Sequence, residues 1–453
     1  MVNTCTYAGG NGEWYPAGFS LTFEQRSDRG TNKTMVNKRF SLSTDQKRLA
    51  DNVISLWALQ AANYLLPLIA LPYLVRTLGT EKFGAVMFAQ AFIQYFILFT
   101  DFGFNLSAPR EIAIHRDSPQ TLQRIFNGVL INKLFLSLVA FGILIALVHR
   151  IPRFAADPWL YYLSFGIVIG NALFPQWFFQ GMERMRFITT LNILSKSIFT
   201  LSIFFLVHQP NDYLWVPILN ATGYVIAAGV GIFIALYQFR MQLAMPGGMW
   251  LFRLLKESSQ FFLSRISVSI YTTSNAFVLG LFNGNTIVGY YTAAEKLYIA
   301  LQAAYQPLVN ALYPYVARYR NNLLYKKIFY FAVGLNVLIC IGLWTVAPWL
   351  IARLYGENMD ASITVFRLLI VIALVVVPSI LIGYPYLAAL GYPGDANGTV
   401  MLGSFVHICG LVILIALNQV NLFTVPLVLA ITESTVLLSR VVLIRKRKLW
   451  RNT

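Results

Sequence analysis

Charged residues are scarce in this sequence. Of its 453 residues, 12% are Asp, Glu, Lys or Arg and 57% are hydrophobic, whereas soluble globular domains carry roughly 25% charged residues. This deficit excludes a large soluble domain. It predicts an all-α polytopic membrane protein whose helices cross the lipid as apolar segments.

Cysteine and histidine are also rare. The three cysteines form no close pair and the four histidines show no metal-ligand spacing, so the sequence predicts no disulfide framework, metal site or cofactor. The histidines are interpreted as loop or interface residues: His115, His149, His208 and His407.

Two catalytic classes lack their signatures. There is no Gly-rich loop ending in Gly-Lys-Ser or Gly-Lys-Thr, which excludes a P-loop ATPase, so energy must come from a gradient or from the substrate. No loop on the outward side is long enough for a folded domain, which disfavours a membrane polysaccharide polymerase. Enzymatic activity and a nucleic-acid partner are therefore not expected.

The N-terminal 34 residues are polar and contain no apolar run of the kind that a cleaved signal peptide requires. Met35 opens a basic stretch that leads directly into the first apolar segment. We therefore expect Met35 to be the natural start, which N-terminal mass spectrometry of the native protein would check.

Twelve apolar segments follow, each about 20 residues long and so able to span a bilayer. They cover residues 50–75, 83–105, 125–148, 158–181, 187–207, 213–238, 258–282, 286–316, 326–351, 363–390, 396–418 and 421–444. The predicted domains are a tail (1–49), a six-helix lobe (50–238), a linker (239–257), a second six-helix lobe (258–444) and a basic tail (445–453).

Basic residues alternate between the two sides of the predicted bundle. Of 35 Lys and Arg residues, 24 fall in the tails and even-numbered loops. The odd-numbered loops hold only five: Arg76, Lys82, Arg150, Arg153 and Arg353. By the positive-inside rule both termini and the linker are cytoplasmic.

Two stretches of the chain share an outline. Residues 79–109 match residues 284–314 at an offset of 205. At this offset glycine aligns with glycine, proline with proline, and a glutamine with a glutamate. The aligned pairs are Gly79 with Gly284, Gly84 with Gly289, Gln90 with Glu295, Ala91 with Lys296 and Pro109 with Pro314. Residues 175–181 and 385–391 correspond at the similar offset of 210.

These correspondences predict two duplicated six-helix lobes around a central cavity, as in many transporters. Chance spacing in helices of similar composition is the alternative. Proline within a spanning helix should bend it at Pro175 and Pro385. The charged pair Glu295–Lys296 has no charged counterpart in the first lobe.

Basic side chains within the spans are costly and therefore informative. There are six of them: Lys133, Lys196, Arg265, Lys296, Arg367 and Arg440. Lys133 and Arg440 lie near cytoplasmic ends, and we favour snorkelling for both. Lys196, Lys296 and Arg265 lie deeper and are expected to face the cavity, where an excess of cations implies an anionic partner.

Embedded acids are fewer, and their roles are open. Glu295 carries a proton or cation, or it neutralises Arg265 across the helix interface. Glu433 and Asp101 are the other two. Arg367, one turn from the outward end, is either a headgroup anchor or an exit-side site.

Neutral polar side chains in the spans suit sugar hydroxyls, although hydrogen bonds between helices would also explain them. The candidates for sugar contact are Asn63, Gln60, Gln90, Gln94 and Asn275. Gln60 occupies the position in the first lobe that corresponds to Arg265.

The sequence resembles the bacterial O-antigen (Wzx-type) lipid-linked oligosaccharide flippases of the multidrug/oligosaccharidyl-lipid/polysaccharide exporter superfamily. The resemblance covers roughly residues 36–448 and is strongest in the first half. It rests on the stretches 63–67, 72–79 with Phe83 and Gly84, 103–107, and 177–181 with Glu183 and Met185, and in the second half on Pro307, Pro314 and Glu433.

The resemblance implies a transporter of the bacterial inner membrane. It would move undecaprenyl-diphosphate-linked O-antigen repeat units from the cytoplasmic to the periplasmic leaflet by alternating access, coupled to H⁺ or Na⁺. Its partners would be that lipid-linked oligosaccharide, membrane lipid and other polysaccharide-assembly proteins.

Roles follow for the candidate residues. Arg265 and Lys296, with Lys196 or Lys133 and with Arg367, would hold the diphosphate. Glu295, Glu433 and Asp101 would couple the ion or gate the path, with Arg110 as a cytoplasmic latch. The alternative is a cation-coupled drug or metabolite exporter that binds cationic cargo at the same acids, which six embedded bases against three acids disfavour.

Overall fold

A computed structural model describes residues 44–320 and 322–450, and it describes side chains from Leu66 onward except at 263–265 and 267–272. Arg265, Gln60 and Asn63 therefore lie outside the described side chains. Within the described chain the secondary structure is helical, without a strand.

The first half of the chain folds into nine helical elements. They are α1 (Thr44–Asp101), α2 (Phe104–Ile114), α3 (Pro119–Arg150), α4 (Pro152–Ala155), α5 (Pro158–Leu173), α6 (Gln176–Gly181), α7 (Met185–Leu206), the 3₁₀ turn η1 (Pro210–Leu214) and α8 (Trp215–Gln238).

The second half also consists of long helices with short connections. Its elements are α9 (Gly248–Asn283), α10 (Asn285–Ala303), α11 (Gln306–Tyr319), α12 (Asn322–Tyr355), α13 (Asp360–Ile382), the π-helical turn η2 (Gly383–Ala388), α14 (Pro393–Ala416) and α15 (Thr424–Lys446).

Within the described residues, eight helices are long and apolar enough to cross a membrane, where the sequence predicted twelve spans. Some predicted spans are broken into shorter helices. The segment 158–181 is divided at Pro175 into α5 and α6, and the segment after Gly284 is divided near Tyr305 into α10 and α11.

The predicted proline bends are present. Pro175 cannot donate a backbone N–H, and the helix stops before it and restarts after it. Pro385 lies in the π-helical turn that ends α13. At Pro175 the interruption therefore has a covalent cause.

Two glycines that the sequence offset of 205 aligns turn the chain sharply. Gly79, inside α1, has a φ of 72°, and Gly284, between α9 and α10, has a φ of 91°. L-residues other than glycine are strained at such angles. We call the end of the molecule that holds these two turns the corner end, and the opposite end, where α1 meets α2 at Gly103, the tail end.

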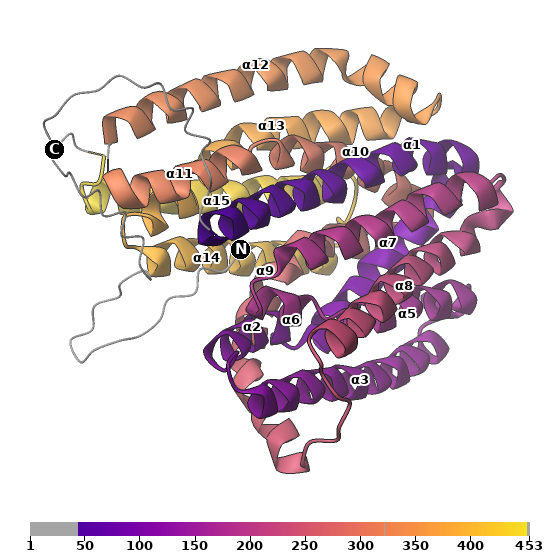
Figure 1. The fold of residues 1–453 in the computed structure, drawn as a ribbon. Helices are drawn as coiled ribbons and strands as arrows, with labels where there is room; N and C mark the ends of the chain where they lie inside the picture. The colour runs from indigo at the N-terminus through magenta and orange to yellow at the C-terminus, as the bar shows by residue number, and fades with distance from the viewer. Residues whose placement is uncertain (1–43, 321, 451–453) are drawn as a thin grey trace, which may run out of the picture.

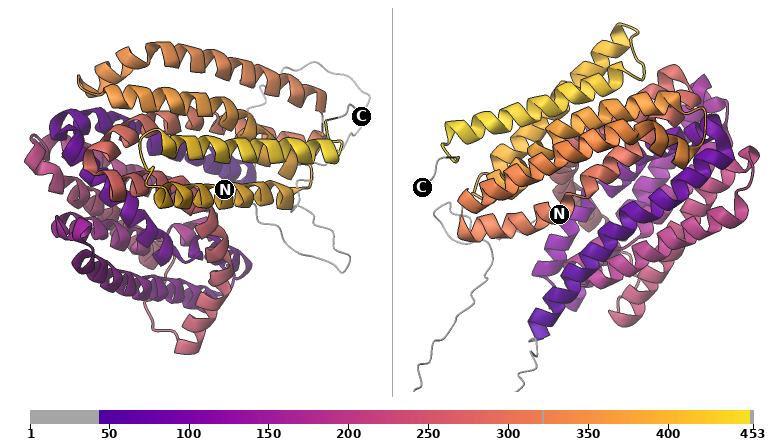
Figure 2. Two further views of the ribbon diagram at one scale, coloured as in Figure 1. Left: turned by 180° about the vertical axis from the view of Figure 1, so that it is seen from behind. Right: turned by 90° about the horizontal axis from the view of Figure 1, so that it is seen from above.

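The helices form two groups (Figure 1). One contains α2, α3 and α5–α8, and the other contains α11–α15; α1, α9 and α10 run between them. The two further views show the same grouping (Figure 2). Apolar clusters fill each group separately, and a third one spans both.

At the corner end the two halves of the chain touch through backbone, where α1 meets α10. A Cβ atom on Gly84 would lie 1.8 Å from the carbonyl oxygen of Asn285, and one on Gly289 would lie 2.3 Å from that of Thr80. Only glycine permits this approach of α1 to α10. Gly84 and Gly289, matched in the sequence at an offset of 205, therefore lie against each other.

Aromatic rings extend this contact. Phe92 stacks on Phe154 and on Phe277, with ring centroids 4.5 Å and 5.6 Å apart. Arg153 donates a 2.5 Å hydrogen bond to Asn285 Oδ1. Side chains from both halves thus close the corner end.

At the tail end α9 makes the described contacts with the first half. Ser107 and Ser258 share a hydrogen bond of 2.7 Å between their hydroxyls, and Phe102 stacks on Phe262 at 4.7 Å. Helix α9 therefore links the two halves here.

On the same side of the molecule, Arg116 forms a hydrogen bond to Glu183, with Nη2 and Oε1 3.1 Å apart. This bond raises the pKa of the Arg116 guanidinium.

Candidate functional site

Two of the predicted cavity cations lie on helices that both pack against α1. Lys196 lies on α7 of the first half and Lys296 on α10 of the second, and both side chains are half-buried. Each lies within electrostatic range of the other. Helix α1 packs against both α7 and α10. Like charges held at one place in a low-dielectric interior favour an anion between them.

Glu295, beside Lys296, belongs to a polar layer inside the second half. Its carboxylate is half-buried and faces the hydroxyl of Tyr291, one turn earlier on α10. That hydroxyl also faces Asn275 on α9, yet it makes no hydrogen bond of standard geometry within the described residues. Tyr291 itself is fully buried. It therefore stands between the carboxylate and a deeper amide.

The layer continues to His407 on α14, which is fully buried. Its Nε2 lies 3.1 Å from Asn275 Oδ1, and its Nδ1 lies 3.1 Å from the hydroxyl of Thr432. That hydroxyl donates to the Val428 carbonyl at 2.8 Å. The Thr432 hydroxyl, which donates to Val428, can accept from Nδ1–H, and the Asn275 amide can either accept from or donate to Nε2, so a neutral imidazole satisfies both contacts.

His407 was interpreted from sequence as a loop or interface residue, and the structure corrects this. Asn275, a predicted sugar contact, is only 3% exposed. Its side chain is engaged by His407 within the second half. Both residues are therefore buried and belong to the polar layer that runs from Glu295 to His407.

Lys133 does not snorkel to the membrane surface as we had favoured. Its side chain is 1% exposed, and Nζ lies 3.2 Å from the Asp101 carboxylate, which is itself buried. A buried cation is stabilised by an opposite charge close to it. The pair joins α3 to the end of α1, which accounts for Lys133 and Asp101 without a ligand.

Arg440 likewise stays inside the protein, at 6% exposure. Its guanidinium donates to the carbonyl and hydroxyl oxygens of Ser379 at 2.6 Å and 3.0 Å, and to the Thr399 hydroxyl at 3.1 Å. Gly383 leaves room for it, since a Cβ there would lie 2.7 Å from Nη1. Glu433, half-buried on the same helix, is within electrostatic range of Arg440.

Arg367 and Arg110 lie apart from this centre. Arg367 donates to the Trp344 carbonyl at 3.2 Å, and its guanidinium lies over the Trp344 ring, 4.5 Å from the centroid. Arg110 is exposed and forms no ion pair with any described residue. The expected cytoplasmic latch is therefore not formed by Arg110 in this structure.

The remaining predicted sugar contacts differ in exposure. Gln90 is half-buried and Gln94 is exposed, both on the part of α1 that follows Gly79. Gln60, Asn63 and Arg265 lie in the stretches whose side chains are not described. The described centre therefore consists of Lys196, Lys296 and the layer from Glu295 to His407.

Sequence reasoning missed Tyr291, Thr432 and His407 as a group. They come from α10, α15 and α14, and no spacing in the sequence connects them. The available signal was a histidine in the middle of an apolar span, because a buried imidazole requires hydrogen-bond partners.

The chain is similar to known proteins in sequence and in fold. A family model described as "Polysaccharide biosynthesis protein" matches residues 49–320, more than half of the chain. A protein of Escherichia coli (strain K12) named "Putative O-antigen transporter" is 31% identical over 279 residues, which are 61% of this chain and 66% of that protein, just under two thirds of its length.

A Shigella dysenteriae protein of the same name is 26% identical over 367 residues, covering 79% of this chain and 90% of the relative. Among solved structures, the lipid II flippase MurJ in an inward closed conformation superposes with a TM-score of 0.63 at 12% identity, over 87% of each chain. That likeness shows the fold. The chain is a multi-pass membrane protein and belongs to the polysaccharide biosynthesis protein family.

Proposed function

We propose that this protein flips undecaprenyl-diphosphate-linked O-antigen repeat units across the bacterial inner membrane. The observation that carries the proposal is that two half-buried lysines, Lys196 of the first half and Lys296 of the second, lie on helices that both pack against α1 and within electrostatic range of each other. A diphosphate cannot enter hydrocarbon unless its charge and hydration are replaced. Two ammonium groups supply that replacement, and Arg265 would add a third cation.

The architecture that we propose has twelve transmembrane helices in two six-helix lobes. The broken segments α5–α6 and α10–α11 would each complete one span. The duplication is supported by the matching turns at Gly79 and Gly284 and by the contact of Gly84 with Gly289. Equivalent residues touch each other only where a pseudo-twofold axis passes, so that axis would run between α1 and α10.

We propose that the repeat unit moves from the cytoplasmic to the periplasmic leaflet. The few basic residues at the corner end, against the many in the predicted cytoplasmic loops, support an outward-facing corner end. Glycine contact and stacked rings close that end here. Transport would require these contacts to separate while the tail end closes, as alternating access demands.

The exporter of cationic compounds is the weaker candidate. Asp101 is paired with Lys133, and Glu433 lies near Arg440. Of the three embedded acids, Glu295 is the one left facing the centre, where Lys296 and Lys196 would repel a cation.

Deleting the gene that encodes this protein in its native cells tests the flipping proposal. Surface polysaccharide should disappear while complete lipid-linked repeat units accumulate, because synthesis precedes flipping. The measurement combines surface-polysaccharide gels with mass spectrometry of extracted lipids. Normal surface polysaccharide, or repeat units that stay incomplete, would contradict the proposal.

For energy coupling we propose protons, carried by Glu295 and His407. Tyr291 lies between the carboxylate and Asn275, and Asn275 contacts the imidazole. A proton on Glu295 would remove the negative charge beside Lys296, and His407 is the next titratable group beyond Tyr291 and Asn275. The protonation of Glu295 and His407 would therefore set the net charge around Lys196 and Lys296.

Glu295→Gln should separate substrate binding from coupled transport. Glutamine keeps the shape and the contact with Tyr291 but cannot release a proton, so substrate should still bind while a proton gradient no longer accelerates flipping. Proteoliposomes with and without an imposed gradient measure this, with His407→Gln as a second variant. A gradient response equal to wild type in both variants would rule out this carrier.

A further inference from the structure

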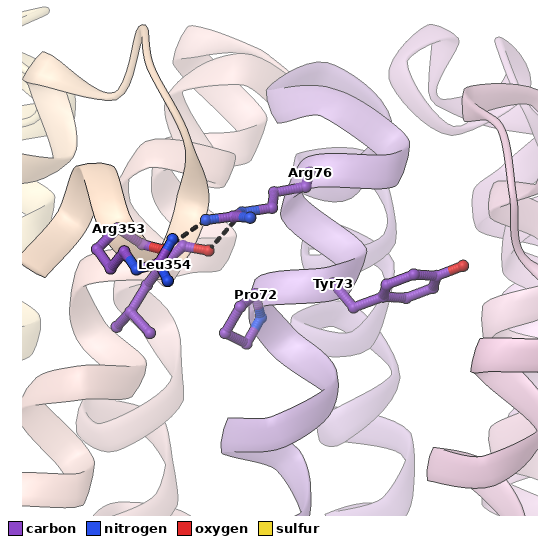
Figure 3. A pocket seen from close by; sticks show the side chains of 5 residues that line it. All are labelled: Pro72, Tyr73, Arg76, Arg353 and Leu354. Carbon is purple, nitrogen blue, oxygen red and sulfur yellow. Dashed lines mark hydrogen bonds between the residues drawn. The ribbon is translucent and has the colours of Figure 1, made fainter.

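A shallow pocket lies at the corner end between α1 and α12 (Figure 3). Its volume is about 430 Å³, and it is lined by Pro72, Tyr73, Arg76, Arg353 and Leu354. It is open on one side. The Tyr73 ring points away from it toward the neighbouring helix, where its hydroxyl donates to the Val207 carbonyl at 2.7 Å. The pocket thus bridges the two halves and is separate from the centre that contains Lys196 and Lys296.

Arg76 crosses from α1 to the end of α12. Its Nε donates to the Leu354 carbonyl at 2.9 Å, and its Nη2 donates to the Arg353 carbonyl. These carbonyls belong to the last turn of α12, where a cation is favourable. A guanidinium has five N–H groups, so those not used here, including both on Nη1, remain available at the pocket.

Arg353 is exposed, and its guanidinium makes no hydrogen bond or ion pair with any residue that the structure describes. The pocket lining contains no acidic residue. Two guanidinium groups therefore share one depression without a carboxylate to balance them. Among ligands, a phosphate matches such groups best, because its oxygens accept parallel hydrogen bonds from Arg.

The position of the pocket suits a lipid headgroup. Arg76 lies one turn before the Gly79 corner, and Arg353 lies in the last turn of α12. Helix α12 is the least buried of the eight apolar helices and exposes Trp344 and Trp349 along its final turns. Exposed tryptophan together with arginine at a helix end is typical of the membrane interface.

We propose that this pocket binds the phosphate of an anionic membrane phospholipid. The headgroup would accept hydrogen bonds from Arg353 and from the free N–H groups of Arg76, and its acyl chains would lie along the exposed face of α12. Because the pocket joins α1 to α12, the bound lipid holds the two halves together at the corner end. The inference does not depend on which cargo the protein carries.

Photo-crosslinking tests the site in the full-length protein. Photoactivatable phosphatidylglycerol is incorporated into nanodiscs, and peptide mass mapping locates the adducts, which should concentrate on residues 72–76 and 353–355. Arg353→Gln should lower labelling there at least about tenfold, the loss expected when one charge-assisted hydrogen bond is removed. Folding should survive, since Arg353 has no described side-chain partner.

Arg150→Gln is the matched control, because it removes an exposed positive charge elsewhere at the same end of the molecule. It should leave pocket labelling unchanged. Equal labelling of wild type and Arg353→Gln, or adducts spread evenly over the lipid-facing helices, would overturn the site. Displacement of phosphatidylglycerol by substoichiometric undecaprenyl diphosphate would overturn the phospholipid assignment and identify the pocket as a cargo site.

Discussion

Replacing Lys196 or Lys296 with methionine should abolish surface polysaccharide while the variants still reach the membrane. Each lysine supplies one of the two described cations at the centre. A hydrogen bond to a charged group is worth about 1.5–3 kcal/mol, so one substitution should weaken diphosphate binding at least about tenfold. Methionine keeps most of the side-chain volume and removes the charge.

Lys256→Met provides the control, because Lys256 is an exposed lysine on α9, away from the centre. It should support normal polysaccharide. Lys296→Arg should retain part of the activity, since it keeps the charge. Normal polysaccharide in both Lys196→Met and Lys296→Met, at wild-type protein levels, would remove this pair from the binding site.

Asp101→Asn should destabilise the protein severely. It leaves the ammonium of Lys133 buried without a countercharge, and breaking a buried pair in this way costs about 3–5 kcal/mol. Thermal unfolding of the purified variant, followed by size-exclusion chromatography after heating, should show a clear loss of stability. Lys133→Met should also destabilise the protein, because it leaves the buried Asp101 carboxylate without its counter-charge.

The double variant Asp101→Leu with Lys133→Met distinguishes a structural pair from a functional one. Replacing a buried ion pair by apolar side chains of similar size is often neutral or stabilising. Stability and transport should therefore both return towards wild type. A double variant that is as stable as wild type but does not transport would show that Asp101 or Lys133 takes part in the transport cycle, contrary to our account.

Sequence predicted well those features that have a local cause. Pro175 interrupts its helix because it lacks an N–H, as predicted. The turns at Gly79 and Gly284 fall in the predicted gaps between spans, and glycine tolerates the positive φ that they need. The match of Gly84 with Gly289 identified equivalent positions in two stretches. That they touch was not predictable, because the contact depends on how the two halves pack.

Which residues the embedded charged side chains contact also depends on how the helices pack. Lys133 and Arg440 lie near helix ends, where long side chains can usually reach water. Their helices are instead rotated so that both side chains point inward, toward Asp101 in one case and Ser379 in the other. Spacing along one helix gives the face on which a residue lies, but not which neighbouring helix covers that face.

The central claim is that the paired cations carry a lipid-linked diphosphate across the membrane. Its most direct test uses purified protein in vesicles that contain undecaprenyl-diphosphate-linked oligosaccharide with a fluorescent sugar, while a membrane-impermeant quencher reports how much sugar faces outside. The account predicts rapid exchange between leaflets with the wild-type protein and none with the Lys196→Met, Lys296→Met double variant. Equal exchange by both proteins, or no exchange by either, would contradict it.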